Sequence, residues 1–219
     1  ATEEQKERYL PPRAEGKEIW CQLFSEPSAG SDVAGLRSKA VKDGDKWIIN
    51  GQKVWTSGAH FSDFGILVVR HDPNIEKHKG MTFFFVDMKS PGIEVKPIKQ
   101  ITGGSSFNEV YFTDVEIPDS QRLGEIGDGW KVAITTLMNE RLAVGDAGGA
   151  DVEDAFRWAK NQDNLGEPLL NNSAARESIA DWYCEKSGLK NTKLRTMSAL
   201  SRGETPGPEA SITKIVSAG

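Results

Sequence analysis

Three short segments carry polar or acidic side chains that could bind a ligand or move a proton. The first, residues 26–32, reads Glu-Pro-Ser-Ala-Gly-Ser-Asp and follows an apolar stretch. Gly30 and Ser31 could present backbone amides and a hydroxyl group to an anion or a carbonyl oxygen. The same composition is also typical of an ordinary loop that contains an Asx-type turn. The residues alone leave both interpretations open.

The second segment, residues 55–59, reads Trp-Thr-Ser-Gly-Ala and ends a stretch with strand composition. The indole of Trp55 beside the hydroxyl groups of Thr56 and Ser57 suits a flat heteroaromatic ligand. A tryptophan in a strand is also commonly part of the hydrophobic core, with hydroxyl groups at the rim of the sheet. The pattern therefore predicts either a ligand face or a core position.

The third segment is the pair Glu140-Arg141, which lies among Leu137, Met138 and Leu142 in a stretch with helical periodicity. A carboxylate that faces apolar neighbours is poorly hydrated, and such a group can act as a general base. A Glu-Arg pair on a helix is also commonly a solvated or ion-paired surface feature. Glu140 is therefore a candidate base, and the surface interpretation stays open.

Other polar segments give weaker signals. Residues 103–106, Gly-Gly-Ser-Ser, lack the lysine and the following helix of a phosphate-binding P-loop, so we expect a hairpin connection there. The histidines lie in loop-like stretches, and we expect them on the surface: His60, His71 and His78. No spacing typical of metal ligands occurs, and the sequence gives no support for a metal site.

The composition excludes several classes of protein. The 219 residues carry a formal net charge of −5, which disfavours binding to nucleic acid phosphates. No apolar run reaches the length of a membrane span. Two cysteines, Cys21 and Cys184, cannot form a disulfide framework, which favours a reducing compartment. We expect a cytoplasmic bacterial protein, with the mitochondrial matrix as the alternative.

Three regions must position these segments. Residues 1–16 contain a short polar helix, Thr2–Leu10, which we expect Pro11-Pro12 to end; this region is interpreted as the stub of a missing N-terminal helical domain. Residues 17–125 alternate short β-branched and aromatic runs with turn residues, and Asn50-Gly51 predicts a hairpin turn. No segment between these runs could form a crossover helix, so an antiparallel barrel or sandwich is expected.

Residues 126–219 have helical periodicity and predict a partial C-terminal helical bundle. Helices are expected over 130–145, with Asp128 as a possible cap, and over 152–160, 173–202 and 209–217, with a loop over 162–172. Several apolar residues of the longest helix are expected to face inward: Ile179, Trp182, Tyr183, Leu189, Leu194 and Met197. The fold class is α+β, and the chain is expected to be part of a longer protein.

The order of several motifs resembles the middle domain of the acyl-CoA dehydrogenase family. Residues 24–32 read Phe-Ser-Glu-Pro-Ser-Ala-Gly-Ser-Asp, and residues 49–57 read Ile-Asn-Gly-Gln-Lys-Val-Trp-Thr-Ser. Residues 107–118 follow as Phe-Asn-Glu-Val-Tyr-Phe-Thr-Asp-Val-Glu-Ile-Pro. Residues 127–130, Gly-Asp-Gly-Trp, and residues 139–141, Asn-Glu-Arg, resemble the start of the family's C-terminal helical domain.

The resemblance implies a flavoprotein with an N-terminal helical domain, a β-domain and a C-terminal four-helix bundle. By resemblance, FAD would contact Phe24 and Ser25, and Ser31 would lie near both the flavin and the acyl-CoA substrate. Trp55 and Ser57 stand at the positions of the family's flavin-contacting tryptophan and threonine. The expected cofactor-binding residues are therefore Phe24, Ser25, Ser31, Trp55 and Ser57. No nucleic acid, metal or membrane span is expected.

The catalytic base is implied less directly. A minority of family members place it in the helix after the β-domain, at the position of Glu140, and many place it nearer the C-terminus. Arg141 matches a family arginine at the acyl-CoA site. Gln162 stands where the family usually has an arginine that reaches the flavin of a neighbouring subunit. The match therefore keeps open a hetero-oligomer in which only some subunits hold flavin.

The activity implied is the oxidation of an acyl-CoA thioester to a 2-enoyl-CoA, with FAD supplying the redox chemistry and a carboxylate removing the α-proton. Electron-transfer flavoprotein is the implied acceptor, and a homo- or hetero-tetramer is the implied assembly. We expect the 219-residue chain alone to be inactive. The alternatives are an acyl-CoA or nitroalkane-type oxidase on the same scaffold, and a non-catalytic subunit of a hetero-oligomeric dehydrogenase.

Overall fold

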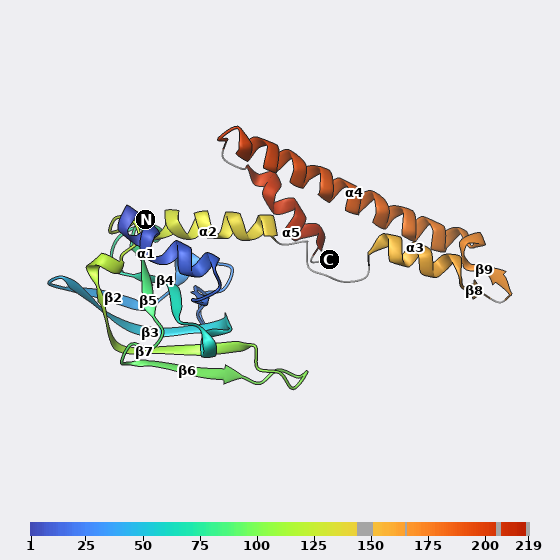
Figure 1. Cartoon of the computed structure of the whole chain (residues 1–219). Helices are drawn as coiled ribbons and strands as arrows, with labels where there is room; N and C mark the ends of the chain where they lie inside the picture. The colour runs from blue at the N-terminus through green and yellow to red at the C-terminus, as the bar shows by residue number, and fades with distance from the viewer. Residues whose placement is uncertain (144–150, 165, 205–206, 218–219) are drawn as a thin grey trace. The chain divides into compact units, whose positions relative to one another are not determined.

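The computed structural model of the chain describes residues 1–143, 151–164, 166–204 and 207–217 (Figure 1). The chain divides into two compact units, Ala1–Ile134 and Thr135–Gly219, which are described separately. The residues of helix α2 (Gly129–Ala143) are divided between the two units. Among the described residues, no helix is both long enough and apolar enough to cross a membrane.

A curled seven-stranded sheet forms most of the first unit (Figure 1). Its strands are β1 (Trp20–Leu23), β2 (Lys39–Asp43), β3 (Lys46–Ser57), β4 (Phe64–Arg70), β5 (Met81–Asp87), β6 (Ile93–Ile98) and β7 (Phe107–Pro118). They are arranged in the order β1-β4-β2-β3-β7-β6, and β5 pairs with the other edge of β4. The core inside the curl is built by alternate residues of these strands, among them Leu23, Ile49, Leu67, Phe84, Val110 and Val115.

The expected α+β class is confirmed, and the expected antiparallel pairing holds for most of the sheet but not for all of it. The ladders β2–β3, β3–β7, β6–β7 and β4–β5 are antiparallel, whereas β1 and β2 run parallel to β4. The parallel pairs need no crossover helix because β2 and β3 themselves lie between β1 and β4 in the chain. Strands β1 and β2 then follow one another along the same edge of β4.

The hairpin turn expected at Asn50-Gly51 is wrong. The chain turns at Gly44, whose φ of 62° places it in the left-handed region, and β3 continues unbroken through Gly51. Gly51 instead allows close approach, since a Cβ there would lie 2.3 Å from the Oγ of Ser38. Asn50 exchanges hydrogen bonds with Asp114 of β7, a non-glycine residue with φ 49° that forms a bulge opposite Asn50.

Helix α1 (Glu3–Ala14) packs on the sheet and is longer than expected. It continues through Pro11 and Pro12, because the fixed φ of proline is helical and their carbonyls still accept hydrogen bonds from Glu15 and Lys17 amides. The buried side chain of Gln5 donates to the carbonyls of residues 120 and 122, both at 2.9 Å. Tyr9 enters an aromatic cluster with Trp20, Phe64 and Phe85.

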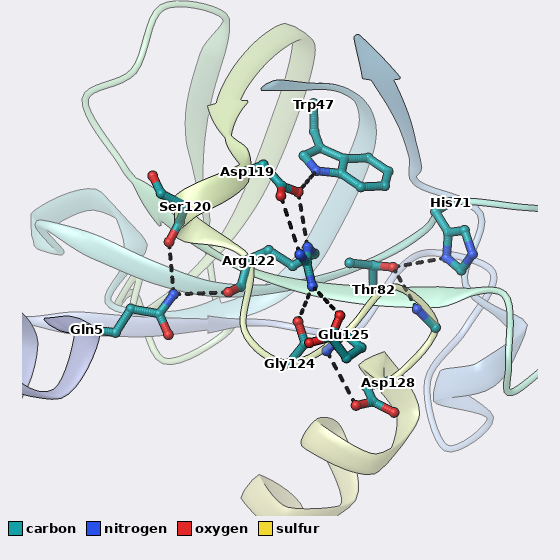
Figure 2. A network of polar contacts seen from close by, with 11 residues as sticks. Gln5, Trp47, His71, Thr82, Asp119, Ser120, Arg122, Gly124, Glu125 and Asp128 are labelled. Carbon is teal, nitrogen blue, oxygen red and sulfur yellow. Dashed lines mark hydrogen bonds and ion pairs between the residues drawn. The ribbon is translucent and has the colours of Figure 1, made fainter. Parts of the chain in front are cut away.

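A polar network holds the connection from β7 to α2 (Figure 2). The Asp119 carboxylate accepts from Trp47 Nε1 at 2.6 Å and from Arg122 Nε at 3.0 Å. Arg122 also donates to the Gly124 carbonyl. Thr82 Oγ1 lies 2.9 Å from the Nδ1 of His71, which is half-buried rather than on the surface as expected, because β5 passes beside it. His60 and His78 are exposed as expected.

The second unit contains α3 (Val152–Lys160), capped by Asp151, and α4 (Ser173–Ser201), capped by Asn172. Both agree with the expected ranges. The expected loop between them holds the two-residue strands β8 (Asp163–Asn164) and β9 (Glu167–Pro168). After α4 come the 3-10 turn η5 (Pro208–Ser211) and α5 (Ile212–Ser217), within the last expected helix.

One expectation for the helices is corrected, and another agrees with the structure. Some α4 residues expected to face inward are 41–57% exposed, because α3 and α5 cover only part of its surface among the described residues: Trp182, Tyr183, Leu194 and Met197. Asp128 stands directly before α2, at the expected cap position, and its carboxylate accepts from the amide of Glu125. The Asp128 carbonyl accepts the first helical hydrogen bond of α2, from Val132.

Candidate functional site

A bulge near the end of β3 distorts the ladder with β7. Lys53 pairs with Val110 and Thr56 pairs with Asn108, so β3 has one residue more than β7 between these positions. Within the bulge, Trp55 adopts φ 60°, in the left-handed region that non-glycine residues rarely occupy. A strained backbone of this kind persists only where the surrounding structure holds it, and such residues are concentrated at functional sites.

The bulge reverses which side chains face outward. Lys53 and Val54 are consecutive buried residues, after which Trp55 and Ser57 are exposed and Thr56 is buried. Trp55 is 60% exposed, which excludes the core position that the sequence left open. The Thr56 Oγ1 atom is buried and has no hydrogen-bond partner in the part of the chain that the structure describes. The exposed indole of Trp55 and the exposed hydroxyl group of Ser57 thus lie on one surface.

The segment after β1 runs beside this bulge. The ring of Phe24 is buried edge-on against Phe83, with the ring centres 5.6 Å apart. The Phe24 carbonyl accepts a hydrogen bond from Lys53 Nζ at 3.1 Å, and the Ser25 carbonyl accepts one from the Val54 amide at 2.9 Å. The structure therefore brings the Phe24-Ser25 backbone together with the strand that carries Trp55.

A buried ion pair lies at the centre of this arrangement. Lys53 Nζ is 2.7 Å from Glu26 Oε1, and both side chains are almost wholly buried. Burial lowers the pKa of Lys53 to about 8 although the Glu26 carboxylate opposes this shift. Burial also disfavours the Glu26 carboxylate, but the charge of Lys53 and hydrogen bonds from Lys53, Arg37 and Ser38 outweigh it and hold the pKa of Glu26 below its usual value.

Sequence reasoning missed Lys53, although a signal was present. Trp47, Ile49 and Lys53 are separated by even numbers of residues, so they share the inward face of β3. A lysine on the inward face of a strand requires a buried partner. Glu26 stands directly after the Phe24-Ser25 segment and supplies it.

The loop that carries Ser31 is tied down at several points. Ser31 is exposed, between the buried Ala29 and the 3-10 turn η1 (Val33–Gly35). The Arg70 guanidinium donates to the carbonyl of Ala34 at 2.5 Å and to that of Leu36 at 3.1 Å. The neighbouring Asp32 carboxylate pairs with Lys77. Ser31 is thus presented to solvent by a loop with fixed ends.

A cavity of about 520 Å³ lies next to Ser57. It is lined by Ser57, Gly58, the 3-10 turn η2 (Ala59–Phe61) and the connection between β6 and β7, which confirms residues 103–106 as part of a hairpin connection. Asn108 fixes this end of the bulge, because its buried amide donates to the Thr56 carbonyl at 2.9 Å and contacts His60 Nδ1 at 3.2 Å. Sequence reasoning did not identify Asn108.

The remaining candidate residues belong to the second unit. Glu140 is an exposed residue of α2, and Arg141 follows it in the same helix, with its side chain outside the described residues. Gln162 follows α3, and its carbonyl accepts from the Leu169 amide at 2.8 Å. Within the described ranges, no group of His, Cys, Asp and Glu residues could hold a metal ion.

Comparison with known proteins gives consistent matches over most of the chain. The model of the acyl-CoA dehydrogenase middle domain matches residues 21–115, and that of the acyl-CoA dehydrogenase C-terminal domain matches residues 127–218. Acyl-CoA dehydrogenase FadE34 of Mycobacterium tuberculosis is 41% identical over 98% of this chain and 30% of its own length. Acyl-CoA dehydrogenase IpdE1 of the same organism is 37% identical over 94% of this chain and 51% of its own length.

Solved structures agree with these matches. The Tcur3481-Tcur3483 steroid ACAD is 33% identical with a TM-score of 0.81, and 97% of this chain matches 55% of that chain. Butyryl-CoA dehydrogenase from Megasphaera elsdenii is 27% identical with a TM-score of 0.85, and 97% of this chain matches 57% of that chain. The architecture is thus that of the flavoprotein dehydrogenases that act on acyl-CoA.

The chain belongs to the acyl-CoA dehydrogenase family, and it matches the middle and C-terminal domains of that family. It spans between 30% and 58% of the length of eight curated relatives, FadE34 and IpdE1 among them.

Proposed function

We propose that the protein containing this chain is an FAD-dependent oxidoreductase that introduces an α,β double bond into an acyl-CoA thioester. The observation that carries this proposal is the exposed Trp55 on a strained bulge, with Ser57 on the same surface and the Phe24-Ser25 backbone beside it. The family match supports the reaction class.

The residues of the bulge fit a flavin. The isoalloxazine ring is flat and has hydrogen-bonding groups along one edge, which requires an apolar face beside hydroxyl or amide donors. Trp55 offers the face, and Ser57, Ser31 and the Phe24-Ser25 segment are the proposed polar contacts. When bound, FAD supplies the hydride acceptor for the oxidation. The chain's own residues bind and orient the ring and the substrate.

Glu140 is the proposed base for the α-proton of the substrate. Its position in the helix after the β-domain agrees with the minority arrangement of the family, and Arg141 beside it is the proposed contact to acyl-CoA. Hydrogen bonds to the thioester carbonyl would stabilise the negative charge that develops when this proton leaves. A base outside this chain is the alternative, and replacing Glu140 distinguishes the two.

We infer that the protein works in an assembly in the bacterial cytoplasm, with electron-transfer flavoprotein as acceptor. Among the structural neighbours are the ChsE4-ChsE5 complex from Mycobacterium tuberculosis, at 30% identity, and a structure reported for the electron transferring flavoprotein of Acidaminococcus fermentans, at 29% identity. Gln162 in place of an arginine favours a second candidate, a subunit of a hetero-oligomer in which another chain completes the flavin site.

An oxidase is a further candidate, because a prolyl acyl carrier protein oxidase, AnaB, matches at 27% identity with a TM-score of 0.87. The electron acceptor separates the two reactions. Release of hydrogen peroxide in air during acyl-CoA turnover would favour the oxidase, and reduction of electron-transfer flavoprotein without peroxide would favour the dehydrogenase.

The test of the proposed function is flavin binding to the full-length protein. We expect the apoprotein to bind FAD and Trp55→Ala to weaken that binding by about two- to tenfold from the aromatic contact alone, since such a contact contributes about 0.5–1.5 kcal/mol beyond buried area. Trp158→Ala is the matched control, because Trp158 is 61% exposed on α3. A wild-type protein that binds no FAD, alone or with a co-purifying partner, would refute the proposal.

A further inference from the structure

The ion pair between Lys53 and Glu26 is the most deeply buried among the described residues, with side chains 0% and 4% exposed. Buried pairs of this kind are weak stabilisers, because removing two charges from water costs about as much as their attraction returns. Apolar residues of similar volume often replace such a pair without loss of stability. The polar contacts that the pair makes therefore indicate a role beyond stability.

The carboxylate of Glu26 closes the loop that carries Ser31. It accepts from the amide of Arg37 at 2.6 Å and from the amide of Ser38 at 3.1 and 3.2 Å. The backbone of Glu26 also exchanges hydrogen bonds with Ala29, at 2.9 and 3.0 Å. Both ends of the loop are thus joined through one side chain in the core.

The ammonium group of Lys53 joins this loop to β3. It donates to the Phe24 carbonyl as well as to Glu26. Val54, the next residue, lies in the bulge and has no paired position on β7, and its amide donates to Ser25. Two consecutive residues of β3 therefore hold two consecutive carbonyls, immediately before the chain turns Trp55 outward.

We propose that Lys53 and Glu26 are positioning residues, which hold the Phe24-Ser25 backbone, the Ser31 loop and Trp55 at the mutual spacing that the flavin ring needs. This inference rests on the proposed function. Neither side chain would touch a ring bound at the exposed face of Trp55, because both are buried in the core of the first unit. The pair acts through the backbone of residues 24–38 and through the bulge.

An apolar pair could not perform this task. The hydrogen bonds from Lys53 to Phe24 and from Ser38 to Glu26 are buried, so removing the side chains would leave a carbonyl and an amide without water or partner. Each segment would then move to find a new partner. Because the bulge holds Trp55 in a strained conformation, we expect the backbone of Trp55 to relax when Phe24 and Ser25 move.

The test compares variants of the ion pair with a core variant that destabilises the same sheet, all in the full-length protein. Glu26→Gln keeps the shape of the side chain but removes its charge, and Lys53→Met removes the ammonium group. Ile117→Ala is the control, because Ile117 is 2% exposed at the opposite end of the β3–β7 ladder and its truncation destabilises the same sheet. FAD affinity is measured well below the melting temperature of each variant.

We expect Glu26→Gln and Lys53→Met to weaken FAD binding by about tenfold or more, whereas Ile117→Ala changes it by less than about twofold at a similar loss of melting temperature. Equal effects on FAD affinity in Glu26→Gln and Ile117→Ala would reduce the pair to a structural role and overturn the proposal. Glu26→Gln decides the question if Lys53→Met fails to fold.

Amide hydrogen exchange in the cofactor-free protein gives a second measurement. Glu26→Gln should accelerate exchange at Arg37, Ser38 and Val54, and Ile117→Ala should not do so selectively. Unchanged exchange at these amides would refute the positioning role. Absence of FAD binding by the wild type would refute the proposed function instead, while normal binding by both wild type and Glu26→Gln would refute only this inference.

Discussion

Replacing Asp119 by asparagine tests the polar network that connects β7 to α2 (Figure 2). The substitution preserves the shape of the side chain but removes its charge, and the amide nitrogen that it introduces faces the Arg122 guanidinium. Asp119 is held by Arg122 and by the Trp47 indole. These two hydrogen bonds lower the pKa of Asp119 from 3.8 to about 2. We therefore expect Asp119→Asn to destabilise the first unit.

The shift in pKa sets the size of the effect. A difference of about 1.8 units corresponds to about 2.4 kcal/mol at neutral pH. Because water partly screens the carboxylate, about 1 to 2 kcal/mol is expected. The folded-state pKa is lowered, so this stabilisation is complete above about pH 5 and is lost progressively as the pH falls through the folded-state pKa of about 2. At pH 3 the difference between wild type and variant should be about half of its value at pH 7.

Urea unfolding of the chain at pH 7 and pH 3, followed by tryptophan fluorescence, measures both values. Glu116→Gln is the control, because Glu116 is an exposed carboxylate of β7 that pairs with Lys46, and its loss should change the free energy of unfolding little. The reasoning is wrong if Asp119→Asn destabilises the protein equally at the two pH values, since the loss would then not come from the charge.

Three further outcomes are expected. Gly51→Ala should lower the free energy of unfolding by about 1–3 kcal/mol, because a Cβ there would lie 2.3 to 2.6 Å from the Oγ, Cβ and Cα atoms of Ser38. Gly104→Ala meets nothing closer than 3.8 Å and should be neutral in the same urea assay. A thiol reagent at pH 8 should modify the exposed Cys184 in the folded protein and spare Cys21, because burial raises the pKa of the Cys21 thiol to about 11. Rapid modification of both cysteines would contradict the described core. Glu140→Gln should reduce turnover of acyl-CoA at least about a hundredfold with FAD still bound, and near-normal turnover would assign the base elsewhere.

The sequence predicted the elements whose physical signal is local. The helix Val152–Lys160 has a capping aspartate before it, and the helix from Ser173 has a capping asparagine. Strands were located by their β-branched and aromatic runs. Asn50-Gly51 failed as a turn because the pair occurs in an unbroken strand, where Gly51 accommodates Ser38 from a segment distant in the sequence. Local composition carries no information on such a contact.

The residues of the candidate site likewise differ in how far the sequence alone predicts them. Trp55 and Ser57 were identified by type and spacing, but their shared surface depends on a bulge, which pairing with β7 creates. Lys53, Glu26 and Asn108 were missed because their importance comes from burial, and burial depends on the whole sheet. The apolar residues of α4 were assigned inward because they have helical periodicity, which does not reveal how much of a helix its neighbours cover.

The two bulges of the β3–β7 ladder have a joint consequence. The bulge at Trp55 adds a residue to β3 and that at Asp114 adds one to β7, so the strands have 12 residues each and pair at both ends, Lys46 with Pro118 and Ser57 with Phe107. Deleting either extra residue would misalign one end of the β3–β7 ladder by a full side-chain alternation. Deleting both would restore alignment while flattening the surface around Trp55. Insertions and deletions in these strands are therefore tolerable only as compensating pairs. The length of each strand depends on the length of the other.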